Sequence, residues 1–309
     1  MLLVAMVYLL SVSEPLDHSA EVQITDDEVQ AILEASEGSI VVKMENLDAV
    51  VPVAVPEPAW RTHAANWASD NKAHIAIIID DLGLNTDMSR QLMLVEGPLT
   101  LAFLPYAEDL QSQVNMLRRN GHEIMVHLPM EPKNINQDPG PNALISGLES
   151  QEFERRIAWN LDRFNGFVGI NNHMGSALTE NPGLMVRLMV SLRRRGLLFV
   201  DSLTSPNSVA MRAAAATGVP HVARDIFLDN ERSMPAILAQ LEKTTQIASK
   251  RGYAIAIGHP YSETLKAIQF WAAGLDERKY TLVPVSQLID QLEGAEQTLA
   301  ETVPPRVRP

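Results

Sequence analysis

The sequence predicts an α/β protein: a distorted (β/α) barrel of about seven to eight parallel strands, forming a single domain with an extended N-terminal segment. From His74 onward, short apolar runs typical of strands buried on both faces alternate with longer segments of helical period. Several helical segments end at a glycine just before the next run, where a left-handed C-cap favours glycine: Gly121, Gly196, Gly218 and Gly252. Strands joined through helices run parallel, and about eight of them in roughly 220 residues suit a closed or nearly closed barrel.

The expected strands are the apolar runs 75–79, 99–104, 123–128, 167–170, 197–200, 219–222, 254–257 and 281–285. Between them, segments such as Asp109 to Arg119 repeat apolar residues on one helical face. Two helix starts are marked by a capping residue before proline, Asn181 before Pro182 and Ser205 before Pro206. An open doubly wound sheet is the alternative architecture, but no G-x-G-x-x-G motif follows a strand, so its dinucleotide-binding form has no support.

The charge and the cysteine count exclude several classes of partner and ligand. The 309-residue chain carries 25 Lys and Arg against 38 Asp and Glu, a formal net charge of -13, which repels phosphate backbones and argues against nucleic-acid binding. Because the chain has no cysteine, any metal must be held by His, Asp or Glu. No obligate protein partner is inferred.

The N-terminal part differs in composition from the predicted barrel. The first ten residues form an apolar run that is as long as a signal h-region and too short to span a bilayer. We therefore expect a truncated signal or membrane anchor over residues 1–20, an acidic, Pro-containing linker over 21–72, the barrel over 73–293 and a flexible tail over 294–309. This organisation predicts an exported protein, periplasmic or envelope-associated, with a possible N-terminal membrane tether.

Polar side chains follow most of the predicted strands at their C-terminal ends. They are Asp80, Asp81, His127, Asn171, Asn172, His173, Asp201, Ser202, Arg224 and His259. Each has a simpler interpretation alone: either aspartate could cap the next helix, His127 could be a core histidine, His259 could cap a turn, and Arg224 could pair with Asp225. In a barrel, however, the C-terminal strand ends meet at one mouth, where barrel enzymes carry out their chemistry. The sequence therefore predicts a site that these residues share.

The residues at these strand ends also resemble a known family, the divergent polysaccharide deacetylases, a distant branch of the NodB-type carbohydrate esterases. Five ordered motifs carry the resemblance: IDDLG at 79–83, GHEIMVHLPME at 121–131, NNHMGS at 171–176, VDS at 200–202 and GHP at 258–260. The resemblance spans about residues 72 to 293. It implies an exported protein with a distorted (β/α) barrel, in agreement with the strand pattern.

In the wider superfamily the first Asp of the pair is the base, the second holds a divalent metal, and two His spaced H-x-x-x-H complete the site. The resemblance thus implies that Asp80 is the base and that Asp81 and His127 are ligands. The position of the second His is Glu131 in this chain. Zinc is the expected metal, and we prefer His173 to Glu131 as the third ligand, because imidazole is common in zinc sites.

The implied function is hydrolysis of acetyl groups on an envelope polysaccharide or amino-sugar glycan. His259 is expected to protonate the departing amine. The expected substrate contacts are Asn171, Asn172, Met174, Asp201, Ser202 and Arg224. Two alternatives remain open at this point: a barrel of the cell envelope that binds a glycan or partner without catalysis, and a metal-dependent phosphoesterase.

Overall fold

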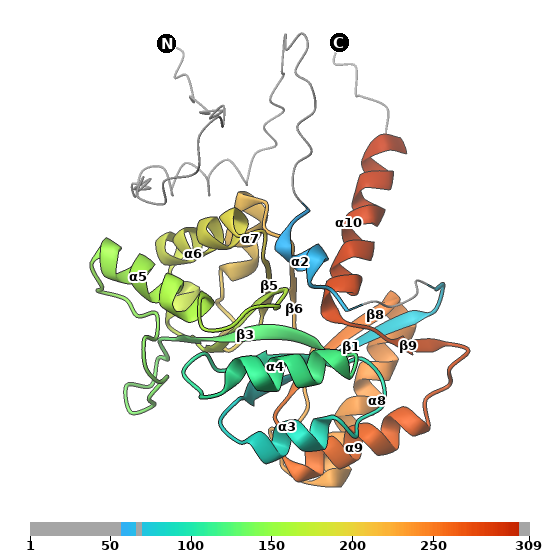
Figure 1. Cartoon of the computed structure of the whole chain (residues 1–309). Coiled ribbons are helices and arrows are strands. Elements are labelled where there is room, and N and C mark those ends of the chain that lie inside the picture. Colours follow the sequence, from blue (N-terminus) through green and yellow to red (C-terminus); the bar gives the residue numbers. More distant parts are fainter. Residues whose placement is uncertain (1–56, 66–69, 303–309) are drawn as a thin grey trace, which may run out of the picture.

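The computed structural model describes residues 57–65 and 70–302, with side chains up to residue 294. Its strands all pair in parallel and form one curled sheet (Figure 1). The strands are β1 (Ala73–Leu82), β2 (Thr100–Phe103), β3 (Glu123–Met130), β4 (Gly169–Met174), β5 (Leu198–Asp201), β6 (His221–Ala223), β7 (Ile226–Phe227), β8 (Tyr253–Gly258) and β9 (Tyr280–Leu282). The helices are α2 (Ala59–Thr62), α3 (Thr86–Leu92), α4 (Leu110–Arg119), α5 (Ser150–Leu161), α6 (Pro182–Arg194), α7 (Ala210–Thr217), α8 (Met234–Arg251), α9 (Ser262–Ala273) and α10 (Val285–Thr302), with a 3₁₀ turn at Leu178–Glu180.

The strand order confirms the predicted distorted barrel. Neighbours run β6-β5-β4-β3-β2-β1-β8-β7, with β9 added beside the start of β1, which is the order of strands around a ring. Among the described strands β6 and β7 do not pair, so the ring has an open seam. Arg224 and Asp225 cross it: Arg224 N donates to Asp201 O at 3.0 Å and Asp225 N donates to Ile255 O at 2.8 Å.

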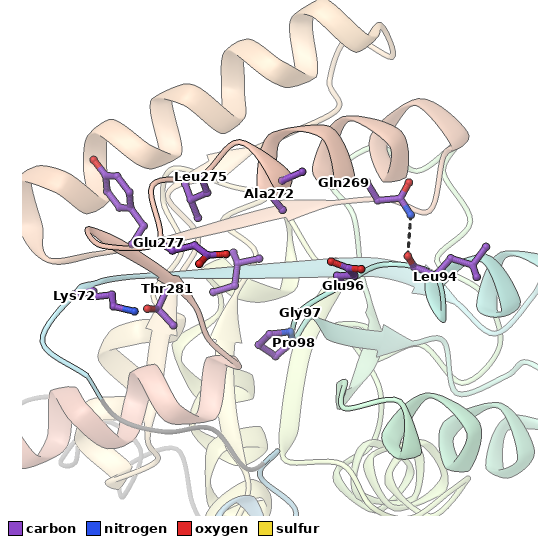
Figure 2. Close-up of a pocket in the computed structure, with 13 residues that line it drawn as sticks. Lys72, Leu94, Glu96, Gly97, Pro98, Gln269, Ala272, Leu275, Glu277 and Thr281 are labelled. Carbon is purple, nitrogen blue, oxygen red and sulfur yellow. Dashed lines mark hydrogen bonds between the residues drawn. The ribbon is translucent and has the colours of Figure 1, made fainter.

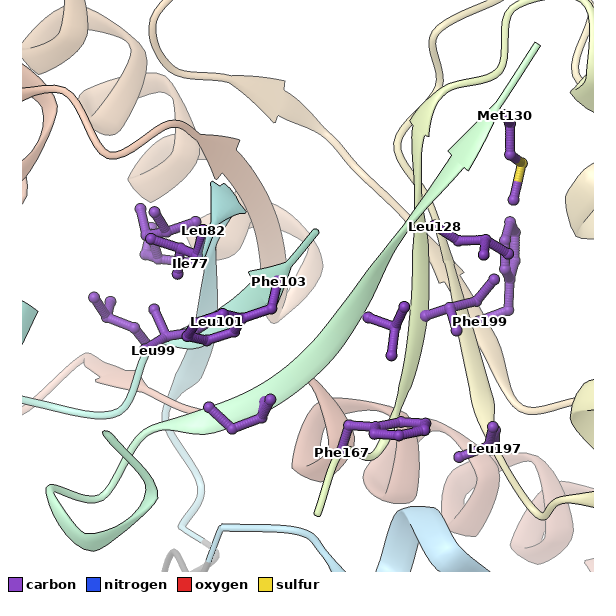
Figure 3. Close-up of a cluster of buried hydrophobic side chains, with 14 of the residues drawn as sticks. Ile77, Leu82, Leu99, Leu101, Phe103, Leu128, Met130, Phe167, Leu197 and Phe199 are labelled. Carbon is purple, nitrogen blue, oxygen red and sulfur yellow. The ribbon is translucent and has the colours of Figure 1, made fainter. Parts of the chain in front are cut away.

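Two hydrophobic cores lie on the two faces of the curled sheet. On β1, Ile75, Ile77 and Ile79 pack outward among the helices, whereas Ala76 and Ile78 face the barrel interior. Figure 3 shows part of the outer core, including Leu101 and Phe103 from β2. This alternation explains why the runs are apolar throughout, because a strand covered on both faces has no solvent-facing position.

The interior core is closed at the N-terminal end of the barrel by two elements that the strand pattern did not predict there. Trp60 of α2 is 3% exposed and belongs to the inner core together with Leu288 and Ile289 of α10. Trp60 N donates to Gly196 O at 2.9 Å, and Arg61 pairs with Asp290 of α10 at 2.7 Å. Residues 57–65, which fall within the predicted linker, are therefore anchored to the barrel by a buried indole.

Some of the predicted helix and strand ends are confirmed and others differ from expectation. The predicted C-cap glycines all have positive φ, and Asn181 caps α6 through Leu184 N. Ser205 does not start a helix, because α7 begins at Ala210. The predicted strand 281–285 ends at Leu282, and α10 continues past the predicted boundary at residue 293 to Thr302. The predicted signal or anchor, most of the linker and residues 303–309 lie outside the described residues. No helix in the described part of the chain is long and apolar enough to cross a membrane.

Replacing Trp60 by alanine is expected to lower the free energy of unfolding by about 3–5 kcal/mol, the usual cost of deleting a buried tryptophan. The indole closes the barrel interior, so its loss leaves a cavity against α10. Urea unfolding of the Trp60→Ala variant measures this change. A loss below about 0.5 kcal/mol, the level of an ordinary surface substitution, would show that α2 is only loosely attached.

Candidate metal centre and active site

Both aspartates at the end of β1 reach the interior of the mouth. Strand alternation predicts that neighbouring side chains diverge. Asp81, however, has φ 56°, and the pairing of β1 with β2 shifts register between Ile79 and Leu82. This left-handed residue turns its carboxylate back, so that His127 Nε2 lies 3.7 Å from Asp80 Oδ2 and 3.3 Å from Asp81 Oδ1. Neither aspartate caps α3, whose N-cap is Asn85.

Asn171 of β4 orients both Asp80 and His127. Its Nδ2 donates to Asp80 Oδ1 at 2.7 Å, and its Oδ1 faces His127 Nδ1 at 2.9 Å. Because an ionised carboxylate only accepts hydrogen bonds, the amide nitrogen must face Asp80 and the amide oxygen must face His127. His127 Nδ1 therefore carries the proton, and in the neutral ring the Nε2 lone pair points toward Asp81.

His173 completes a group of three ligand atoms. Its Nδ1 lies 3.0 Å from Asp81 Oδ1, and the ligand atoms of Asp81, His127 and His173 all lie within 4.8 Å of one another. Tetrahedral ligands that are about 2.1 Å from zinc stand roughly 3.4 Å apart, close to the two separations from Asp81 Oδ1. Glu131, the alternative ligand, is not in this group, because its Oε2 accepts hydrogen bonds from Ser146 N at 2.7 Å and Ser146 Oγ at 2.6 Å.

The carboxylate of Asp81 has the features of a metal ligand. Two imidazole nitrogens lie near Oδ1, yet neither approaches with hydrogen-bond geometry, so Oδ1 is a buried oxygen without a hydrogen bond from any described residue. A buried oxygen in this state is costly unless a cation or another donor is present. One carboxylate and two imidazoles are a common ligand set for catalytic zinc. The residues therefore fit a divalent ion.

The charges within the site shift its pKa values strongly. Burial raises the pKa of Asp80, against the charges of His127 and His259. Burial also opposes ionisation of Asp81, but the imidazoles of His127 and His173 hold the pKa of Asp81 well below its usual range. Burial alone lowers the pKa of His127, but the charge of Asp80 and the proximity of Asp81 outweigh it and raise this pKa to about 9.

Metal binding is therefore expected to release a proton. Below its pKa of about 9, His127 is protonated in the metal-free protein, and a metal needs its Nε2 lone pair. The apparent zinc affinity should rise by about tenfold per pH unit between about pH 6.5 and pH 8.5. Titrations with a competing chelator at several pH values measure this slope. An affinity independent of pH would contradict the assignment of His127 as a ligand.

His259 approaches the metal group from β8 and is held by a carboxylate that the sequence analysis did not assign. His259 Nε2 lies 3.7 Å from Asp81 Oδ2. Asp229 is 3% exposed; its Oδ1 is 3.0 Å from His259 Nδ1 and its Oδ2 accepts from His259 N at 2.6 Å. Burial lowers the pKa of His259, but the hydrogen bond to Asp229 and the charge of Asp80 raise it overall. Asp229 follows the two-residue strand β7, so the strand-end rule identifies it once β7 is recognised.

Two neighbouring residues at the end of β5, both predicted to contact the substrate, lie on opposite faces of the sheet. Ser202 shares the interior face with Val200, and its Oγ accepts from Asn171 Nδ2 at 3.3 Å. Asp201 lies on the same, outward face of β5 as Phe199. Its carboxylate accepts hydrogen bonds from Leu203 N at 2.8 Å and from Ser208 Oγ at 2.6 Å. Asp201 therefore stabilises the loop after β5, with both of its oxygens bonded to protein groups.

Asn172, Met174 and Arg224 also support the mouth. Asn172 Oδ1 accepts from Ser202 N at 2.8 Å, and its Nδ2 donates to Met174 O at 2.8 Å. Met174 has φ 53°, which bends the chain at the end of β4. Arg224 donates to Ser202 O at 2.8 Å through Nε and does not pair with Asp225, whose partner is Arg251.

Two hollows of the described surface lie away from the metal group. One, of about 590 Å³, lies beside the N-terminal ends of β1 and β2, where Gln269 Nε2 donates to Leu94 O at 3.2 Å (Figure 2). The other, of about 850 Å³, follows the open seam of the barrel and is lined by residues that include Arg224 and Ile289 of α10. Neither is lined by Asp80, Asp81, His127, His173 or His259.

The chain is similar to several known proteins. The chain is similar to the uncharacterized protein YibQ of Escherichia coli K12, with 36% identity over 70% of this chain and 67% of that protein. It is also similar to an uncharacterized protein of Haemophilus influenzae, with 31% identity over 67% of this chain and 73% of that protein. A crystal structure of an uncharacterized protein from Agrobacterium tumefaciens C58 superposes with a TM-score of 0.73 and 27% identity, over 75% of this chain and 95% of that one.

The family assignment rests on most of the barrel. Residues 77–289 match the sequence model of the divergent polysaccharide deacetylases, a range that includes β1 to β9 almost entirely and every member of the metal group. The resemblance seen in the five motifs is thus confirmed over the whole domain. The chain belongs to the divergent polysaccharide deacetylase family.

Proposed function

We propose that this protein removes acetyl groups from an envelope polysaccharide or amino-sugar glycan, with a divalent ion, zinc, held by Asp81, His127 and His173. One observation carries the proposal: the ligand atoms of Asp81, His127 and His173 lie within 4.8 Å of one another. Beside them lie the buried carboxylate of Asp80 and the imidazole of His259, which Asp229 holds. The three ligand residues come from the separate strands β1, β3 and β4, and packing alone does not require their ligand atoms to meet.

The bound ion would supply Lewis acidity, which polarises a carbonyl and makes water more acidic. Asp80 accepts the proton of the attacking water, and its raised pKa favours this role, because a base works best when its pKa approaches the working pH. Asn171 holds one oxygen of Asp80 and leaves Oδ2 for the proton. Backbone N–H groups near Met174 and Gly175 are suited to stabilise the oxyanion.

His259 provides the proton that the departing nitrogen needs. The water oxygen bonds to the acetyl carbon, the C–N bond breaks, and the amine takes a proton from His259 Nε2, giving acetate and a free amine. Asp229 holds Nδ1 and keeps the imidazolium in place, as the carboxylate does in other histidine–carboxylate pairs. The raised pKa of His259 keeps the ring protonated at higher pH than a free histidine.

The proposal is tested by incubating the zinc-loaded protein with acetylated chitooligosaccharides and measuring acetate release, in parallel with phosphomonoesters. Acetate release that a chelator abolishes and zinc restores is the expected result. Phosphate release without acetate release would favour a phosphoesterase. Binding of the oligosaccharide without any release would favour a non-catalytic glycan-binding barrel.

The cell envelope is the proposed location, because the first ten residues resemble a signal h-region and the proposed substrate is an envelope glycan. Cell fractionation of a C-terminally tagged protein tests this. Recovery with the cytoplasmic fraction would contradict it.

Asp229→Asn is expected to shift the alkaline limb of the pH–activity profile to lower pH. The carboxylate of Asp229 raises the pKa of His259, and His259 must be protonated to act as an acid. Activity is lost as the pH rises through this pKa, so removing the carboxylate brings the loss to lower pH, with a fall in kcat of about tenfold to a hundredfold. Asp225→Asn is the matched control, because Asp225 pairs with Arg251 and not with His259. Equal pH profiles for the wild type and Asp229→Asn would contradict the pairing.

A further inference from the structure

We propose, building on the deacetylation proposed above, that the glycan substrate carries an anionic substituent and that Arg232 binds it at the His259 side of the mouth. The anionic group would be a carboxylate or a phosphate on the sugar next to the one that is deacetylated. Arg232 is then a specificity-determining residue rather than part of the chemistry.

A short series of contacts connects Arg232 to the metal group. The guanidinium of Arg232 lies 3.9 Å from the centroid of the Tyr261 ring, and its Nη2 donates to Tyr261 Oη at 2.6 Å. The Tyr261 ring lies 5.6 Å from the ring of His259, tilted by 34°. His259 Nε2 is 3.7 Å from Asp81 Oδ2. Arg232 therefore stands at the rim, one aromatic ring away from the proposed acid.

Arg232 is exposed, and among the described residues it forms no ion pair with a carboxylate. Arg251 provides the contrast: it stacks in the same way on Tyr253, also at 3.9 Å, at the other end of β8, but it pairs with Asp225. The phenol holds the guanidinium of Arg232 in one orientation and uses only part of its donors. A planar guanidinium with free N–H groups is suited to a carboxylate or a phosphate.

A second arginine is linked to the same histidine through another aromatic ring. The guanidinium of Arg224 lies 5.2 Å from the Phe227 ring, and Phe227 lies 5.3 Å from the His259 ring. Arg224 donates to Ser202 O and Leu203 O, and it too has no carboxylate partner among the described residues. Arg224 and Arg232 are thus each separated from His259 by one aromatic ring. In a chain with a net charge of -13, two such cations favour an anionic ligand near this histidine.

The test compares three tetrasaccharides on the zinc-loaded protein: neutral N-acetylchitotetraose, a chain alternating N-acetylglucosamine with N-acetylmuramic acid, and a 6-phosphorylated N-acetylchitotetraose. The variants are Arg232→Gln, Arg232→Lys and the control Arg278→Gln, whose side chain is 89% exposed and pairs with Asp276. Initial rates give kcat and KM, and isothermal titration calorimetry gives Kd without requiring turnover.

The wild type is expected to prefer one of the two anionic chains, and that preference identifies the group as a carboxylate or a phosphate. Arg232→Gln should lower kcat/KM for the preferred chain by about tenfold, mainly through KM, and change the value for the neutral chain by less than about twofold. Arg232→Lys should recover part of the loss, and Arg278→Gln should behave like the wild type. Equal losses on neutral and anionic chains, or no anionic preference in the wild type, would overturn the inference.

The two proposals fail in different ways. Arg232-dependent binding of an anionic chain without acetate release would support the anion site and contradict the deacetylase. Acetate release that is insensitive to Arg232→Gln on all three chains would support the deacetylase and contradict the anion site.

Discussion

His127→Ala is expected to abolish metal retention and to lower acetate release by at least about a thousandfold, because the Lewis acid is lost with the ligand. His127 is 2% exposed, and its Nε2 lies 3.3 Å from Asp81 Oδ1, so no other described side chain replaces it at this position. Its orientation is set by Asn171, which leaves Nε2 as the free ring nitrogen. Metal analysis after dialysis, together with the acetate assay, measures both effects.

His221→Ala is the matched control for this variant. His221 begins β6, at the opposite end of the sheet from the mouth, and its Nδ1 hydrogen-bonds to Val219 O at 2.7 Å. This substitution should leave about one zinc ion per chain, as expected for a single site. Full zinc content in His127→Ala would remove His127 from the ligand set.

His259→Ala is expected to keep the metal and lose turnover. His259 Nε2 lies 3.7 Å from Asp81 Oδ2, and His259 is not one of the three residues of the ligand group. The loss of a general acid lowers kcat by about a hundredfold to ten-thousandfold. Metal content, kcat and KM measured on one preparation separate this effect from that of His127→Ala.

The two histidine variants are informative as a pair. If both lose the metal, His259 is a ligand. If both keep metal and activity alike, neither role holds. Only metal loss in His127→Ala with retained metal and low kcat in His259→Ala agrees with the proposed division of roles. Circular dichroism of both variants shows whether the fold is intact.

Much of the fold could be predicted from the sequence because its signals are local. A run of apolar residues without polar alternation indicates a strand that is buried on both faces. A glycine at positive φ ends a helix. Both signals depend on only a few neighbouring residues. The strand-end rule also placed Asp80, His127, Asn171 and His259 around one mouth, as the structure has them. The structure brings these residues together because the C-terminal ends of parallel barrel strands lie at one mouth, however the connecting helices pack.

The features that the sequence did not predict depend on contacts between distant segments. The buried position of Trp60 depends on the open end of the barrel and on α10, which follows more than two hundred residues later. Asp229 was not assigned because β7, the strand before it, has only two residues and pairs with β8. Such a short strand leaves no apolar run in the sequence that would predict it. The sequence also did not predict that Asp201, on the outward face of β5, accepts a hydrogen bond from Ser208 Oγ.

The sequence by itself determined the parallel barrel, the family motifs and the ends of the strands from which the site is built. Only the tertiary structure decided that Asp81 turns back beside Asp80, that His173 rather than Glu131 joins the ligand group, and that Asp229 holds His259. The physical reason is that a strand pattern sets which face a side chain occupies. A backbone turn at φ 56° and a hydrogen bond between residues thirty positions apart depend on the packing of the complete barrel.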